Sequence, residues 1–114
     1  MWKRLTGEHI EDIQKTIISD ILSYPDIERE TLEFYVGADS QRTDKKIKFV
    51  TAIALYNKGK GGLGYYLPEI YRNMENRDRL WTETYKAVES AQWLNQVIQP
   101  LGLRVNEVHA DHIS

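Results

Sequence analysis

The chain has 114 residues, a formal net charge of −2 and no cysteine. Its length suits one domain, and an apolar fraction of 41% excludes a wholly disordered chain. The lack of cysteine excludes disulfides and thiolate chemistry, and no apolar run has the length of a membrane span or the place of a signal peptide. We therefore expect a cytoplasmic protein with no membrane partner.

The first third of the chain predicts a helix followed by a strand. Apolar residues recur at helical spacing from about residue 7 to residue 23, Thr6 is a candidate cap, and Pro25 ends the pattern. Residues 32–38 then alternate between apolar and other side chains, as a strand does, and this strand ends on Asp39. A carboxylate that directly follows a buried strand is a candidate functional group.

Two further strands are predicted after this aspartate. Residues 41–45 are polar and suit a hairpin turn. Residues 47–56 are apolar on nearly every position, which predicts a central strand covered on both faces. A glycine-rich turn at 57–62 leads into a third strand at 63–67, which Pro68 is expected to end.

The last part of the chain predicts a long helix and a final strand. The polar stretch 69–78 is expected to be irregular, and residues 79–98 show the 3.6-residue periodicity of a helix. Glu83 lies on the apolar stripe of this helix. Residues 103–110 form the final predicted strand, which leads to Asp111.

These elements predict an α/β fold in which tight turns make the first three strands antiparallel. The helical crossover then allows the last strand to run parallel to the first, beside it. In this arrangement Asp39 and Asp111 leave the sheet at the same edge, and Glu83 faces it from the helix. Three carboxylates in one place suit Mg²⁺ or Mn²⁺, which prefer oxygen ligands.

Each carboxylate also has a simpler interpretation. Aspartate is common where strands pass into turns, so Asp39 and Asp111 need not bind anything. Glu83 could lie at a boundary where it reaches water, or it could pair with Arg79 one helical turn earlier. The three acids together are more specific than any one of them.

Other constellations are weaker. A zinc site would need the set His109, Asp111 and His112, whose spacing matches no common zinc pattern. Ser40 as a nucleophile lacks an evident histidine base. The glycine-rich stretch 59–62 could hold a phosphate, but a hairpin turn explains it more simply because no helix follows.

Basic and aromatic residues indicate where a nucleic acid could bind. Lys45, Lys46 and Lys48 follow the first strand closely and could contact phosphates, although lysines also solvate exposed turns. Trp81 and Tyr85 on the long helix could stack on bases, although packing is the more frequent role of such residues. The net charge of −2 argues against tight binding driven by bulk charge alone.

The chain resembles the YkuK-type family of predicted ribonuclease H-like proteins. The resemblance rests on residues 35–41, with their Gly-Ala-Asp-Ser-Gln sequence, on residues 48–54 and 59–62, on Arg79 and Leu80 with Glu83, and on residues 108–111. It implies a ribonuclease H-like mixed sheet, in which a fourth strand lies parallel to the first of three antiparallel strands. It also implies a two-metal nuclease site held by Asp39, Glu83 and Asp111.

The resemblance also implies a departure from the usual fold. Ribonuclease H-like domains continue past the fourth strand with a helix and further elements, whereas this sequence stops at Ser114. We therefore expect one domain over residues 1–114, with a core over about residues 31–114, in which the C-terminal part of the usual fold is absent. A homodimer that completes the sheet is an accompanying expectation.

The leading functional hypothesis is a divalent-metal-dependent nuclease acting on RNA, an RNA–DNA hybrid or DNA. Asp39, Glu83 and Asp111 are its expected catalytic metal ligands, and Ser40 and Gln41 are expected to contact substrate or orient Asp39. The main alternative is a non-catalytic module on the same fold that binds nucleic acid or protein. A third is an interaction domain whose acids only solvate strand ends.

Overall fold

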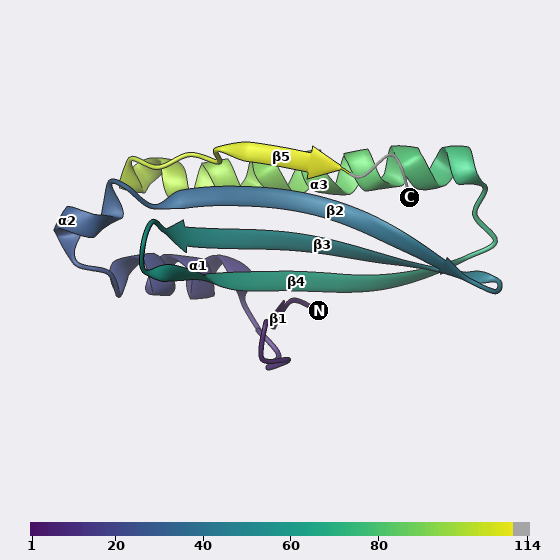
Figure 1. Cartoon of the computed structure of the whole chain (residues 1–114), viewed down its shortest axis with the longest axis horizontal. Helices are drawn as coiled ribbons and strands as arrows, with labels where there is room; N and C mark the ends of the chain where they lie inside the picture. Colours follow the sequence, from purple (N-terminus) through teal and green to yellow (C-terminus); the bar gives the residue numbers. More distant parts are fainter. Residues whose placement is uncertain (111–114) are drawn as a thin grey trace.

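The protein is built on one long five-stranded sheet with both main helices on the same face (Figure 1). The computed structural model describes residues 1–110. The strand order across the sheet is β1-β4-β3-β2-β5. In chain order the elements are β1 (Lys3–Arg4), α1 (Ile13–Leu22), α2 (Asp26–Arg29), β2 (Glu33–Thr43), β3 (Lys46–Asn57), β4 (Gly61–Arg72), α3 (Asn76–Ile98), the 3₁₀ helix η1 (Gln99–Leu101) and β5 (Glu107–Ala110).

The predicted topology of the four main strands is confirmed. β2 pairs with β3 and β3 pairs with β4, both antiparallel, whereas β5 pairs with β2 in parallel. The turn between β2 and β3 is tight, with Asp44 in the left-handed region at φ 50°, and so tight a turn can join only antiparallel strands. α3 supplies the long crossover that a parallel pair requires.

The first three main strands are longer than predicted. β2 continues to Thr43, so Asp39 lies inside the strand, paired with Val50, and not at its end. β4 continues through Pro68 to Arg72. Proline is tolerated there because β1 pairs with β4 only at Tyr65 and Tyr66, so the strand is an edge at Pro68 and needs no N–H on that side.

The helices and the last strand also have different bounds from those predicted. α1 begins at Ile13, not near residue 7, because Asp12 and not Thr6 is its N-cap: Asp12 Oδ1 accepts a hydrogen bond from the Lys15 backbone N–H at 3.1 Å. α3 begins at Asn76, three residues before its predicted start. The final strand is the short β5 and does not begin at residue 103.

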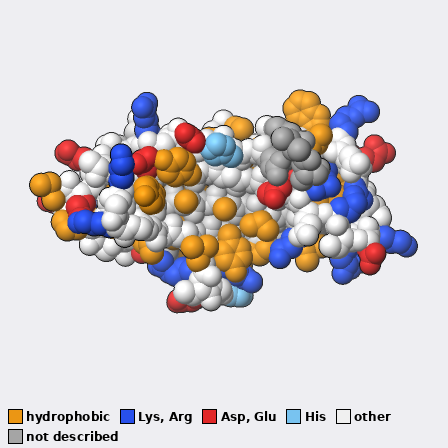
Figure 2. Space-filling model, in the orientation of Figure 1, with side chains coloured by type: hydrophobic (Ala, Val, Ile, Leu, Met, Phe, Trp, Pro, Cys, Tyr) orange, Lys and Arg blue, Asp and Glu red, His pale blue; other side chains and the backbone are white. Residues whose placement is uncertain are grey.

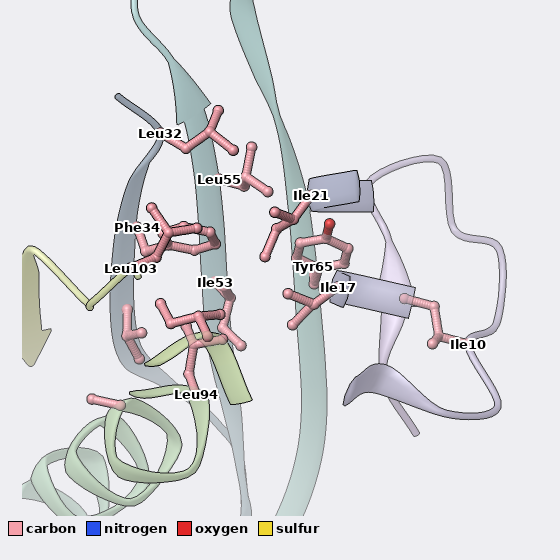
Figure 3. Close-up of a cluster of buried hydrophobic side chains, with 13 residues drawn as sticks. Ile10, Ile17, Ile21, Leu32, Phe34, Ile53, Leu55, Tyr65, Leu94 and Leu103 are labelled. Atoms are coloured by element: carbon pink, nitrogen blue, oxygen red, sulfur yellow. The ribbon is translucent and has the colours of Figure 1, made fainter. Parts of the chain in front are cut away.

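The core lies between the sheet and the helices (Figure 3), and no helix within residues 1–110 covers the other sheet face. The prediction that both faces of β3 are covered is wrong, because Ala52, Ala54 and Tyr56 are exposed. Apolar side chains at nearly every position of β3 had suggested two covered faces. In the structure the helices cover one face, and only alternate residues of the strand are buried against them. The core cluster is Ile10, Ile17, Ile21, Leu32, Phe34, Val36, Ile53, Leu55, Tyr65, Ala91, Leu94, Ile98 and Leu103.

A polar cluster ties the N-terminal segment to the sheet. The Tyr65 hydroxyl, which is fully buried, donates to Asp20 Oδ2 at 2.5 Å. Arg4 donates to both oxygens of the same carboxylate, at 3.0 and 3.2 Å. Asp20, on α1, therefore joins β1 through a bidentate pair with Arg4 and β4 through Tyr65.

Tyr65 is expected to resist ionisation until the protein unfolds. Burial, and then its hydrogen bond to Asp20, raise the pKa of Tyr65 far above the ordinary value near 10. Because the folded pKa is the higher one, the stability from protonated Tyr65 is complete below about pH 10 and is lost as the pH rises beyond it. Alkaline titration of tyrosinate absorbance beside circular dichroism should show this phenol ionising only with unfolding.

Tyr65→Phe provides the control for that titration, since it removes the delayed ionisation but keeps the buried ring. Tyr66→Phe, on the open face of the same strand, should leave the delayed phase in place. A late phase that survives in Tyr65→Phe would contradict the assignment.

Candidate functional site

A buried polar cluster joins β2 to the N-terminal half of α3. Ser40 follows Phe34, Val36 and Ala38 on the helix-covered face of β2, because alternate residues of a strand share a face. Its hydroxyl donates to Glu83 Oε1 at 2.5 Å. Glu83 has no exposed surface, so the buried stripe of α3 includes this carboxylate.

Glu83 keeps one oxygen without a partner. Its Oε2 is buried and has no hydrogen-bond partner among residues 1–110. A buried polar atom left unpaired costs roughly 1–3 kcal/mol, and more when it is charged. This cost marks Glu83 as a candidate functional residue.

Arg79 brings a positive charge to the same cluster. Its Nε donates to the Ser40 hydroxyl oxygen at 2.5 Å and its Nη2 donates to the Ser40 carbonyl at 2.8 Å. Arg79 and Glu83 lie one helical turn apart and share Ser40 as a hydrogen-bond partner. The two side chains are thus linked through the Ser40 hydroxyl. Ser40 itself is buried and turned away from solvent.

Asp39 lies next to this cluster in sequence but on the other face of the sheet. Its side chain is exposed, and Oδ1 accepts a hydrogen bond from the Ser40 backbone N–H at 2.8 Å. Strand alternation sends Ser40 toward α3 and Asp39 toward the open face. The structure thus brings Glu83 together with Ser40 and Arg79, and does not bring its carboxylate against Asp39.

Asp111 and His112 fall outside the described residues, so their expected places remain predictions. Ala110 is paired with Ala38, which puts the residue before Asp111 beside the residue before Asp39. His109 lies on β5 and its Nε2 is 2.7 Å from an oxygen of Glu107. Within residues 1–110, no three acidic or histidine side chains are close enough to hold a metal ion together.

The other predicted substrate contacts lie at the β2–β3 hairpin. Gln41 pairs with Lys48 across the two strands, and both are exposed on the same face as Asp39. Lys45 is exposed in the turn, and Lys46 is exposed at the start of β3. Of the predicted substrate contacts, these four are open to a ligand, whereas Ser40 is not.

A second polar cluster, on the covered face, was not predicted. Lys86 Nζ is 2.7 Å from Glu69 Oε1 and 3.0 Å from the Tyr71 hydroxyl, and it lies over the rings of Tyr71 and Phe49. Burial acts to lower the pKa of Lys86, but the hydrogen bonds to Glu69 and Tyr71 outweigh it and raise the pKa. Glu69 lies in the stretch 69–78 that was predicted to be irregular, so the sequence did not indicate the Lys86–Glu69 ion pair.

Comparison with known proteins agrees with the fold. No helix within residues 1–110 is long and apolar enough to cross a membrane. Searches of curated proteins and of solved structures find no match. A family model described as Ribonuclease H-like matches residues 12–113, which is most of the chain. With the parallel β5 beside β2 and the crossover helix between them, this match shows that the chain belongs to the Ribonuclease H-like family.

Proposed function

We propose that this protein is a divalent-metal-dependent nuclease that hydrolyses phosphodiester bonds in RNA, RNA–DNA hybrid or DNA. The observation that carries the proposal is the unpartnered oxygen of Glu83, fully buried beside the point on β2 where Asp39 lies. Membership of the Ribonuclease H-like family supports it. A buried carboxylate without a partner is costly unless a cation or a proton compensates it.

The donor atoms fit Mg²⁺ or Mn²⁺ in kind. Asp39, Glu83 and Asp111 would hold the ions, because hard cations take carboxylate oxygens. Asp39 and Glu83 lie on opposite faces of the sheet, so to share an ion both side chains would have to turn toward a common edge. When bound, two such ions would supply an activated water and counter-charge for the leaving oxygen. Ser40 fixes one oxygen of Glu83 while the other has no partner, and the Ser40 backbone N–H orients Asp39.

The remaining groups of the chain would position the substrate. Lys46 and Lys48 are exposed on the Asp39 face and can contact phosphates. Arg79 holds Ser40 by two hydrogen bonds, so it is a positioning residue for Glu83.

Cleavage assays with the wild-type protein test this proposal. Labelled single-stranded RNA, RNA–DNA hybrid and DNA should be cut in Mg²⁺ or Mn²⁺ and remain intact in EDTA. The same ions should raise the melting temperature, since a ligand that binds only the folded state stabilises it. Absence of cleavage on all three substrates, with no thermal shift, would show that the site is not a metal-dependent nuclease.

One observation favours a second candidate, a module that binds nucleic acid without cutting it. Arg79 already places a cation beside Ser40 and one turn from Glu83. A guanidinium can balance a buried carboxylate without any metal. This candidate is supported if nucleic acid binds with a steep salt dependence while Mg²⁺ and Mn²⁺ change neither the melting temperature nor the substrate.

A further inference from the structure

The open face of the sheet carries a hollow beside Asp39. The cavity has a volume of about 430 Å³ and is lined by Gly37, Ala38, Asp39, Val50, Ala52 and His109. Gly37 pairs with Ala52 on one side and with His109 on the other, so these three form one row across the sheet. Asp39 and Val50 form the next row. Small residues make the floor of this shallow, open hollow.

Basic side chains gather on the hairpin side of the hollow. Beyond Asp39, toward the β2–β3 hairpin, Lys48 pairs with Gln41, and Lys46 pairs with Arg72. All three basic residues are exposed, and Figure 2 shows basic side chains gathered at this end of the molecule. Successive rows are roughly 7 Å apart, because two residues separate them along a strand.

On the other side of the hollow the same face carries two acids. Glu107 pairs with Tyr35 one row beyond the hollow, and Glu33 lies a further row away. A polyanion is therefore attracted toward the basic residues at the hairpin end. Tyr66 lies in the row of the hollow, paired with Ala52, and offers an aromatic ring beside the floor.

We propose that the hollow takes an unpaired base of a single-stranded nucleic acid, whose phosphates run from Asp39 toward Lys48, Lys46 and Arg72. This inference rests on the proposed function and names the substrate class of that site. A base inside a duplex has both faces covered by its neighbours and cannot enter a hollow, whereas an unstacked base can. The floor offers contact area but few side-chain donors, so binding is expected to tolerate many sequences.

A matched pair of substitutions on β3 tests the inference. Ala52→Leu fills the hollow, whereas Ala54→Leu makes the same change two residues along the same strand and face, outside its lining. Fluorescence anisotropy in EDTA, with labelled single-stranded RNA and DNA, measures binding without cleavage. Ala52→Leu should weaken binding about 10-fold, the loss expected when one stacked base is excluded. Ala54→Leu should change it less than about 2-fold.

Two further measurements complete the test. Lys48→Gln should reduce the slope of log affinity against log salt by about one, because one phosphate contact is lost. A blunt RNA–DNA hybrid should bind more weakly than either single strand. A hybrid that binds as tightly as single strands, or an Ala52→Leu protein that binds like wild type, would overturn the inference. So would failure to bind either nucleic acid, as expected if the hollow receives a protein segment.

Failure of the inference and failure of the proposed function give different results. A protein that cuts only duplexes, with Ala52→Leu unaffected, leaves the nuclease in place and removes the single-strand site. A protein that binds single strands through the hollow but cuts nothing in Mg²⁺ or Mn²⁺ keeps the site and removes the nuclease.

Discussion

Asp39→Asn is expected to lower the rate of phosphodiester cleavage by about 100-fold or more. The substitution keeps the size of the side chain and its oxygen for the Ser40 N–H, but removes the negative charge that would hold a divalent cation. Losing one group that stabilises a transition state typically costs about 10²–10³-fold in rate. Single-turnover cleavage at saturating Mn²⁺ and at saturating Mg²⁺ would measure the loss.

Asp44→Asn is the matched control for this change. Asp44 is an exposed acid in the β2–β3 turn, and its φ of 50° suits asparagine as well as aspartate. The control should therefore retain both fold and activity. Because Asp39 is exposed, Asp39→Asn should melt within a few degrees of wild type. Equal cleavage by Asp39→Asn and wild type would remove Asp39 from the site.

Glu83→Gln is expected to stabilise the metal-free protein while abolishing its response to metal. Glutamine can still accept the Ser40 hydrogen bond through its amide oxygen, and its amide nitrogen stays without a partner, but the potential buried charge is gone. Loss of the buried charge should raise the free energy of unfolding in EDTA by about 1 kcal/mol. The neutral amide is a poor ligand for Mg²⁺ or Mn²⁺, so their stabilising effect and the cleavage activity should both disappear.

Urea unfolding in EDTA and in Mn²⁺ separates the two effects. Glu89→Gln, an exposed change on the same helix, should leave stability and metal response as in wild type. A Glu83→Gln protein that is less stable than wild type in EDTA would show that the carboxylate is well compensated without metal. Arg79 would then be the compensating group, acting through Ser40.

The topology could be predicted because turn lengths decide it. The tight turn at Asp44 and the glycine-rich turn before β4 force antiparallel pairing, and the long helix permits a parallel return. Family resemblance and residue pattern agree here, and the structure confirms both. The ends of the strands were harder to predict. Pro68 was expected to end β4, but it lies at a sheet edge, where proline is tolerated, and only the three-dimensional arrangement shows this.

The candidate site could be predicted only in part. Glu83 was singled out correctly as an unusual acid on a buried stripe, and it is fully buried. Its partner was harder to identify, although alternation already placed Ser40 on the apolar face of β2 and Asp39 on the other. The sequence does not show which face of the sheet α3 packs against. The convergence of Asp39, Glu83 and Asp111 remains a prediction.

The parallel pairing of β5 with β2 has a consequence for the order of folding. The Phe34 backbone N–H bonds the Asn106 side chain across 72 residues, whereas the three long strands pair through short hairpins. Contacts between distant residues carry a larger loop-closure cost and form later. The β2–β4 meander should therefore assemble first. Until β5 pairs with it, one edge of β2 has unpaired backbone groups. Newly made chains are then most prone to aggregate before the C-terminal strand docks.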